Sequence, residues 1–113
     1  MKKLEIIVRP GVAEGVRQAI EAIGYPGITI SSAEGHGSQK GLSNERNARN
    51  SRLEMIPKIR MDIVIPDSAL DKIVDAVIRT ARTGKLGDGK IFISDISDAI
   101  RIRNGDKGER AIT

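Results

Sequence analysis

The chain contains no cysteine, and this absence excludes disulfide bonds, thiolate nucleophiles and zinc–thiolate centres. Tryptophan is also absent, and Tyr25 and Phe92 are the only aromatic residues, so the core is expected to be aliphatic. Proteins that bind single-stranded nucleic acid use aromatic side chains as stacking platforms, so this class is a weak candidate despite the net charge of +4. The single histidine, His36, excludes a two-histidine metal site and a histidine–cysteine triad.

Long hydrophobic runs are missing as well, and the 113 residues contain no signal-peptide pattern and no lipidation motif. A chain of this length is expected to form one domain, which spans residues 1–113. We therefore expect a soluble cytoplasmic protein.

The hydrophobic pattern predicts an α+β fold with the element order βαββαβ. Alternating apolar residues predict four strands, at residues 4–8, 28–33, 58–65 and 91–94. Apolar residues at helical spacing predict one helix from Val12 to Ile23, ended by Gly24, and another from Leu70 to Ala81. This order is typical of the ferredoxin-like fold, a four-stranded antiparallel sheet with two helices on one face.

Three local features complete this prediction. Ser68-x-x-Asp71 resembles a capping box at the start of the second helix, and residues 97–100 are expected to form one helical turn. Ile7, Val64 and Phe92 fall on the sheet face opposite the main apolar stripe. An exposed apolar face with open sheet edges favours self-association into a closed oligomer.

The run from Arg79 to Ser94 carries the strongest functional signal. Its glycines, Gly84, Gly87 and Gly89, allow a turn with free backbone N–H groups, because glycine alone enters positive φ without steric cost. Basic residues surround this turn, namely Arg79, Arg82, Lys85 and Lys90. Free amides together with cations suit a polyphosphate, although an ordinary glycine- and lysine-rich surface loop is the alternative.

A Walker A motif is only partly matched by this loop. Residues 84–90 fit G-x-x-x-x-G-K, but Ile91 replaces the required Ser or Thr, and a strand follows where a helix should begin. We therefore interpret it as a phosphate-holding loop of another kind.

A second basic turn follows near residue 101. If Arg101-Ile102-Arg103 is extended, both guanidinium groups point to the same side, and residues 104–108 then turn the chain. Two separate glycine-rich basic loops in so short a chain favour an anionic ligand over chance.

A long polar segment without periodicity runs from Gly35 to about Glu54, and such a loop is usually functional or disordered. Residues 42–52 fit a solvated loop, whereas Gln39, beside glycines, offers a neutral oxygen to a hard metal ion.

Taken together, these segments resemble the PII nitrogen-regulatory signalling family. The resemblance spans residues 2–10, 35–41, 79–94 and 100–112. Its most specific parts are Ala81-Arg82-Thr83-Gly84-x-x-Gly87-Asp88-Gly89-Lys90-Ile91-Phe92 and Ile100-Arg101-Ile102-Arg103-x-Gly105. In the terms of that family, residues 37–55 are the T-loop, residues 82–90 the B-loop and residues 101–110 the C-loop.

The resemblance implies a non-catalytic homotrimer with nucleotide sites between subunits, where ATP and ADP compete. It also implies that 2-oxoglutarate binds with MgATP and that the T-loop then grips or releases an ammonium transporter or an enzyme or regulator of nitrogen assimilation. By position, the nucleotide site would comprise Ile7, Thr29, Gly35, Gly37, Ser38, Asp62, Val64, Gly87, Asp88, Gly89, Lys90, Arg101 and Arg103. The 2-oxoglutarate site would comprise Gln39, Lys40, Gly41 and Lys58, with Gln39 also ligating Mg²⁺ and Lys58 pairing with the distal carboxylate.

The chain departs from the family pattern at several of these positions. Ser38 replaces an arginine near the phosphates, and Asp62 replaces a glutamate. Ser51 stands where other members carry a uridylylated tyrosine, and Asn47 replaces the arginine that plugs the ammonium channel. Uridylylation is therefore not expected. Two alternatives stay open: a variant that senses adenylates only and controls a target outside nitrogen metabolism, and a slow ATPase using Asp62 or Asp88.

Overall fold

Six helices and strands follow one another in the predicted order in the structure, a computed structural model that describes residues 1–35 and 56–113. They are β1 (Lys2–Val8), α1 (Pro10–Ile23), β2 (Thr29–Gly35), β3 (Ile56–Ile65), α3 (Leu70–Ala81) and β4 (Lys90–Asp95). Two short 3₁₀ helices cover Asp67–Ala69 and Gly108–Ala111. The T-loop predicted at residues 37–55 lies outside the described residues.

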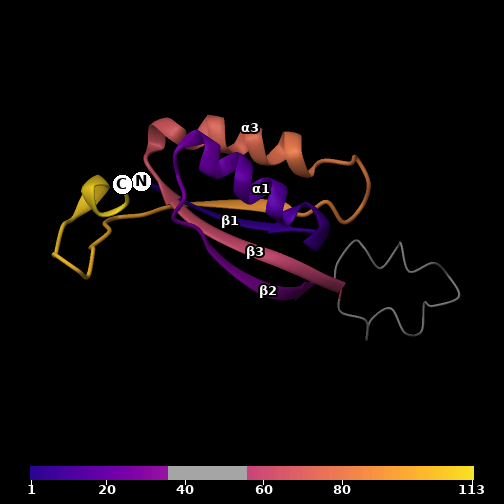
Figure 1. The fold of residues 1–113 in the computed structure, drawn as a ribbon, viewed down its shortest axis with the longest axis horizontal. Helices are drawn as coiled ribbons and strands as arrows, with labels where there is room; N and C mark the ends of the chain where they lie inside the picture. Colours follow the sequence, from indigo (N-terminus) through magenta and orange to yellow (C-terminus); the bar gives the residue numbers. More distant parts are fainter. Residues whose placement is uncertain (36–55) are drawn as a thin grey trace, which may run out of the picture.

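The strands form one four-stranded sheet in the order β2-β3-β1-β4, with every neighbouring pair antiparallel. Both helices lie on the same face of this sheet (Figure 1). The ferredoxin-like fold predicted from the sequence is therefore confirmed. The opposite face carries no helix among the described residues, and Phe92 on this face is 54% exposed.

Aliphatic side chains fill the space between the sheet and the helices. Leu4, Ile6, Met61 and Ile65 alternate along the two central strands and are fully buried. The helices add further buried residues at helical spacing, namely Val16, Ile20, Ile73 and Val77. Side chains repeat their direction every two residues in the strands and every 3.6 residues in the helices, so the apolar residues of both kinds of element face the same core.

The ends of α1 agree with the residues found there. Pro10 occupies the first turn, where its missing N–H costs nothing, so the helix begins two residues before the predicted Val12. Gly24 ends it in the left-handed conformation with φ 117°, and its N–H bonds to the carbonyls of Glu21 and Ile20.

Two local predictions are wrong. The capping box at Ser68 and Asp71 is absent, because Asp67–Ala69 form a 3₁₀ turn and α3 begins at Leu70 with no side-chain cap. Residues 97–100 form no helical turn, because the chain there extends from β4 and Ile100 pairs with Lys107 in an isolated β-bridge.

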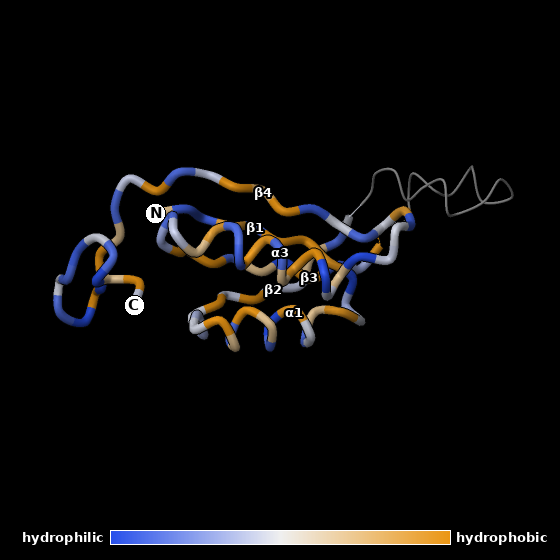
Figure 2. The backbone as a smooth tube through the Cα atoms, turned by 90° about the horizontal axis from the view of Figure 1, so that it is seen from above, coloured by the Kyte–Doolittle hydropathy of each residue, from blue (hydrophilic) through white to orange (hydrophobic). Residues whose placement is uncertain are grey.

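The β4 strand forms one edge of the sheet and runs outside the helices (Figure 2). Ile93 of β4 and Ile30 of the other edge strand, β2, are each about half exposed, although both are paired with core residues. Among the described residues, neither helix is long and apolar enough to span a bilayer.

Candidate functional site

The B-loop connects the end of α3 to the start of β4 and has the backbone geometry predicted for it. Gly84, Gly87 and Gly89 all have positive φ, at 83°, 95° and 105°. Gly89 is pressed against β1, so that a Cβ at this position would lie 1.8 Å from the carbonyl oxygen of Ile7. Only glycine fits this close approach.

Asp88 uses its carboxylate to close the B-loop on itself. Oδ2 accepts hydrogen bonds from the backbone N–H groups of Thr83, at 2.8 Å, and Gly84, at 2.9 Å. Oδ1 accepts a further hydrogen bond from the Thr83 hydroxyl and lies 3.4 Å from the Arg9 guanidinium. The hydrogen bonds from Thr83, above all from its hydroxyl, lower the pKa of Asp88 to about 2.

Two cationic side chains, those of Lys58 and Arg9, bind backbone carbonyls of the B-loop. Lys58 of β3 is only 5% exposed, and its Nζ donates a hydrogen bond to the carbonyl of Gly87 at 2.7 Å. Arg9, at the junction of β1 and α1, donates to the neighbouring carbonyl of Leu86. Burial lowers the pKa of Lys58, and the charge of Arg9 lowers it further, whereas Asp88 opposes the shift. The two cations outnumber the single carboxylate, so the base of the loop is electropositive.

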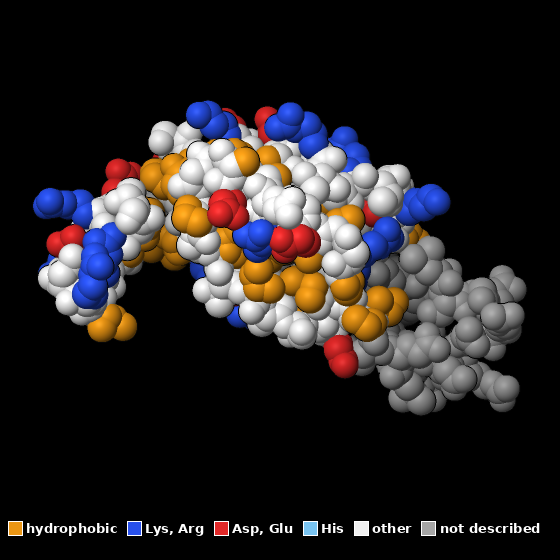
Figure 3. Space-filling model, viewed as in Figure 1, with side chains coloured by type: hydrophobic (Ala, Val, Ile, Leu, Met, Phe, Trp, Pro, Cys, Tyr) orange, Lys and Arg blue, Asp and Glu red, His pale blue; other side chains and the backbone are white. Residues whose placement is uncertain are grey.

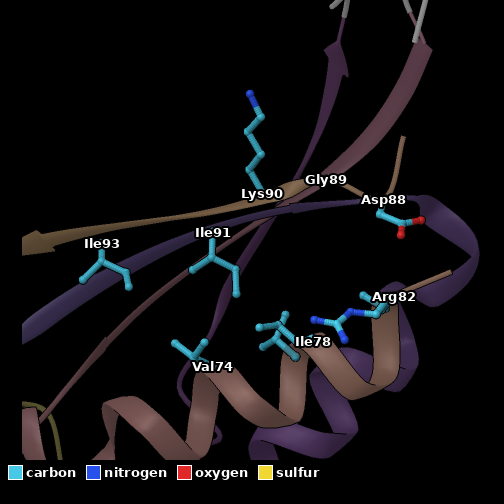
Figure 4. Close-up of a pocket in the computed structure, with 10 residues that line it drawn as sticks. Val74, Ile78, Arg82, Asp88, Gly89, Lys90, Ile91 and Ile93 are labelled. Carbon is cyan, nitrogen blue, oxygen red and sulfur yellow. The ribbon is translucent and has the colours of Figure 1, made fainter. Parts of the chain in front are cut away.

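Five of the predicted nucleotide residues lie on the face of the sheet that bears no helix. Ile7 is paired with Lys90 across β1 and β4, and Thr29 is paired with Asp62 across β2 and β3. Val64 follows Asp62 by two residues in β3 and therefore shares its face. Figure 4 shows the Lys90 side chain pointing away from α3, toward this open face.

A hollow of about 730 Å³ lies at the end of the sheet near the C-terminal segment. Thr29, Asp62, Val64 and Arg101, all predicted to bind nucleotide, contribute to its walls together with residues 23–27 and 111–113. The Oδ2 atom of Asp62 accepts a hydrogen bond from Arg60 at 3.1 Å, whereas its buried Oδ1 has no partner among the described residues. A buried acceptor without a hydrogen-bond donor destabilises the folded protein. We therefore expect this atom to accept a hydrogen bond from a bound ligand.

The C-loop differs from the prediction in one respect. Arg101 to Arg103 are not extended, because a turn closes there with the Gly105 N–H bonded to the Arg101 carbonyl at 2.8 Å. Arg101 donates to the main-chain oxygens of Arg110, at 2.6 Å, and Thr113, at 2.8 Å. Arg103 is exposed. The turn predicted at residues 104–108 begins earlier, at residue 102, and the chain has reversed by Lys107, which pairs with Ile100.

The B-loop and the C-loop lie at opposite ends of the molecule, joined by β4 (Figure 1). The structure therefore does not bring Arg101 and Arg103 to Gly87, Asp88, Gly89 and Lys90 within one chain. Gly35 ends β2 opposite Ile56. The predicted ligands Gly37, Ser38, Gln39, Lys40 and Gly41 lie outside the described residues.

An apolar groove that the sequence pattern did not predict lies between α3 and β4, next to the B-loop. Its volume is about 380 Å³, and Val74, Ile78 and Ile93 line it, while Arg82 and Asp88 lie at its B-loop end (Figure 4).

The surface of the helices seen in Figure 3 differs from this groove, because basic and acidic side chains are interspersed there. Arg17, for example, pairs with Glu14 and Glu21 on α1.

Arg9 belongs to the candidate site, although the sequence pattern did not predict it there. Its partner Leu86 is 77 positions away in the chain, and no local motif marks an arginine between a strand and Pro10. Only the fold brings the two together. Tyr25, which lines the hollow of about 730 Å³, was likewise not expected there.

The fold and the loops together define a class of protein: a ferredoxin-like domain with a glycine-rich loop between α3 and β4, whose carbonyls are bound by the buried Lys58 and the partly exposed Arg9. Comparison with known proteins makes the assignment specific. A profile of the family described as "Nitrogen regulatory protein P-II" matches residues 1–106. The chain belongs to this P-II family, whose members are signalling regulators rather than enzymes.

Individual relatives align with almost the whole length of this chain. Nitrogen regulatory protein P-II 1 of Escherichia coli (strain K12) is 41% identical over 99% of this chain and 100% of its own length. Nitrogen regulatory protein P-II of Bradyrhizobium diazoefficiens is 42% identical with the same coverage. The crystal structure of Arabidopsis thaliana PII bound to citrate matches with a TM-score of 0.80 and 34% identity, covering 98% of this chain and 88% of that one.

Proposed function

We propose that this chain is a non-catalytic P-II signalling protein that binds ATP or ADP at the B-loop. The observation that carries the proposal is the set of fixed glycines at positions 84, 87 and 89, beside Lys90 on the open face. The backbone N–H of Gly87 has no hydrogen-bond partner among the described residues, so this donor is available to phosphate oxygens. Backbone amides in such a concave turn bind anions readily.

The adenosine end of the ligand is proposed to lie beside Asp62 and Thr29. The buried Oδ1 of Asp62 needs a hydrogen-bond donor, and a hydroxyl or amino group of a nucleoside supplies one. Thr29, its cross-strand partner, adds a second polar side chain at the same hollow.

The separation of the two basic loops supports a site shared between copies of the chain. Arg101 and Arg103, together with the hollow at Thr29 and Asp62 that Arg101 also lines, meet a nucleotide held at the B-loop only if they come from a neighbouring copy. Ile102 is fully exposed at the tip of the C-loop, and Phe92 is 54% exposed on the open sheet face, so apolar surface is available for contact. We propose a homotrimer with three such shared sites.

Electropositive surroundings at Lys58 support a dicarboxylate effector next to the nucleotide. We propose that 2-oxoglutarate binds there with MgATP and that residues 37–55 then change their hold on a nitrogen-metabolism partner, either an ammonium transporter or an enzyme or regulator. The described residues contain no group of three or more His, Cys, Asp or Glu that could hold a metal. Mg²⁺ would therefore be held mainly by the nucleotide phosphates, with Gln39 as its protein ligand.

Asp88 argues against the alternative of a slow ATPase. A carboxylate whose pKa is about 2 and whose oxygens already accept hydrogen bonds is a poor general base at neutral pH. The electrostatic features of the loop therefore favour binding over hydrolysis.

Isothermal titration calorimetry with ATP, with ADP, and with MgATP plus 2-oxoglutarate tests the proposal. We expect both nucleotides to bind, and the variant Lys90→Ala combined with Arg103→Ala to lose this binding while the oligomer survives in sedimentation. Unchanged affinity in that variant would reject the assigned phosphate site.

The effector has its own test in Lys58→Ala. We expect this variant to lose far more affinity for 2-oxoglutarate than for nucleotide, because Lys58 supplies the buried positive charge but only one of the bonds that hold the B-loop. Lys72→Ala, which removes an exposed lysine of α3, is the control. If the wild-type protein binds adenylates and ignores 2-oxoglutarate, the adenylate-only alternative is correct.

A further inference from the structure

The carboxylate of Asp88 is fully used inside the protein. It accepts hydrogen bonds from two backbone N–H groups and from the Thr83 hydroxyl, and it pairs with Arg9. A carboxylate has room for about four such partners, so little capacity remains for a ligand. Its negative charge would also repel a phosphate. The side chain of Asp88 therefore shapes the loop instead of touching the anion.

Arg9 ties this loop to the fold. It lies between β1 and α1 in an extended conformation, with φ −65° and ψ 146°, directly before Pro10 in the first turn of α1. Its guanidinium reaches both the Leu86 carbonyl and the Asp88 carboxylate. A planar guanidinium with several donors can hold two acceptors at once, which a lysine ammonium does less rigidly.

The consequence for the loop follows from the geometry of the peptide bond. Arg9 and Lys58 hold the consecutive carbonyls of Leu86 and Gly87. In a planar trans peptide the carbonyl of one residue and the N–H of the next point in opposite directions, and the described chain contains no cis bond. The N–H groups of Gly87 and Asp88 are therefore directed away from the two cations.

We propose that Arg9 is a positioning residue of the B-loop, which together with Asp88 fixes the direction of the Gly87 and Asp88 amides and acts on the ligand only through them. The loop-fixing part stands on the hydrogen bonds of the free protein. The effect on affinity rests on the proposed nucleotide function.

Amide hydrogen exchange of the ligand-free protein, followed by NMR, tests the loop-fixing part directly. In Arg9→Met we expect the Thr83 and Gly84 amides, which bond to Asp88, to exchange about tenfold faster, the loss typical of one hydrogen bond to a charged group. Arg9→Lys should restore part of the protection. Arg17→Met, which removes an arginine that pairs only within α1, is the matched control and should leave these amides unchanged.

Exchange elsewhere in the chain separates this role from general destabilisation. Protection of the core amides in β1 and β3 should be the same in Arg9→Met as in the wild type. Faster exchange over the whole chain, or wild-type exchange at Thr83 and Gly84, would overturn the proposal.

Calorimetry with ATP and ADP tests the second part. Arg9→Met should weaken both nucleotides by the same factor, about tenfold, and adding Asp88→Asn should cause little further loss because both act on the same loop. Additive losses would instead indicate that Arg9 contacts the ligand itself. If the wild type binds neither nucleotide, the proposed function fails, and the exchange experiment still decides whether Arg9 fixes the loop.

Discussion

The two glycine-rich basic loops are similar in sequence but are stabilised by different parts of the molecule. The B-loop is held by Arg9 and Lys58, which come from the β1–α1 junction and from β3. The C-loop is held by residues of its own segment, because Arg101 bonds to Asp106, Arg110 and Thr113. A loop fixed by the core opens only when the core is disturbed, whereas a self-contained loop can rearrange locally. Similar composition therefore does not imply similar rigidity.

The largest expected effect is the difference in stability between a methyl group added to the B-loop and one added to the C-loop. Gly89→Ala should lower the free energy of unfolding by about 3 kcal/mol, because its Cβ would collide with the Ile7 carbonyl and φ is positive there. Gly105→Ala, with φ 74° and no atom within 4 Å of the new Cβ, should cost only about 1 kcal/mol. Urea denaturation of both variants measures the difference, and equal losses would contradict it.

The second-largest effect is expected at acid pH, where protonation of Asp88 removes its contribution to the stability of the B-loop. The pKa of Asp88 is lower in the folded protein than its ordinary value of 3.8, so its contribution to stability is complete above about pH 4 and is lost as the pH falls toward 2. The stability difference between wild type and Asp88→Asn should therefore stay constant from pH 7 to pH 4 and shrink below it. Thermal unfolding across this range gives the curve, and a difference that grows on acidification would have the wrong sign.

The smallest effect is expected in the C-loop. Arg101→Met should lower the free energy of unfolding by about 1 kcal/mol or less, since the lost hydrogen bonds are local and partly exposed. Amide exchange should accelerate within residues 105–113 and remain unchanged in the B-loop. A large global loss would show that the C-loop is not self-contained.

Alternation and helical spacing predicted nearly all of the fold. The strands around Leu4, Met61 and Ile91 and the helices around Ile20 and Ile73 appear where the pattern placed them, because burial of one face is a local property of the sequence. The failures were also local. Ser68 was expected to cap α3, but the 3₁₀ turn at Asp67–Ala69 places the helix start at Leu70.

The site was predicted less completely, for a physical reason. The glycines of the B-loop could be recognised because positive φ restricts the residue type directly. The support provided by Arg9, and the bond from Lys58 to Gly87, join residues far apart in the chain. The division of the two loops between opposite ends of β4 also became visible only in three dimensions (Figure 1).

The contact between Gly89 and the Ile7 carbonyl also offers a criterion for judging other sequences. A related chain that keeps the surrounding basic residues but carries a larger side chain at this point cannot bring its loop down onto the first strand. Such a chain would retain the basic composition without the backbone geometry of this loop. One glycine is thus a better indicator of the loop conformation than the total number of lysines and arginines.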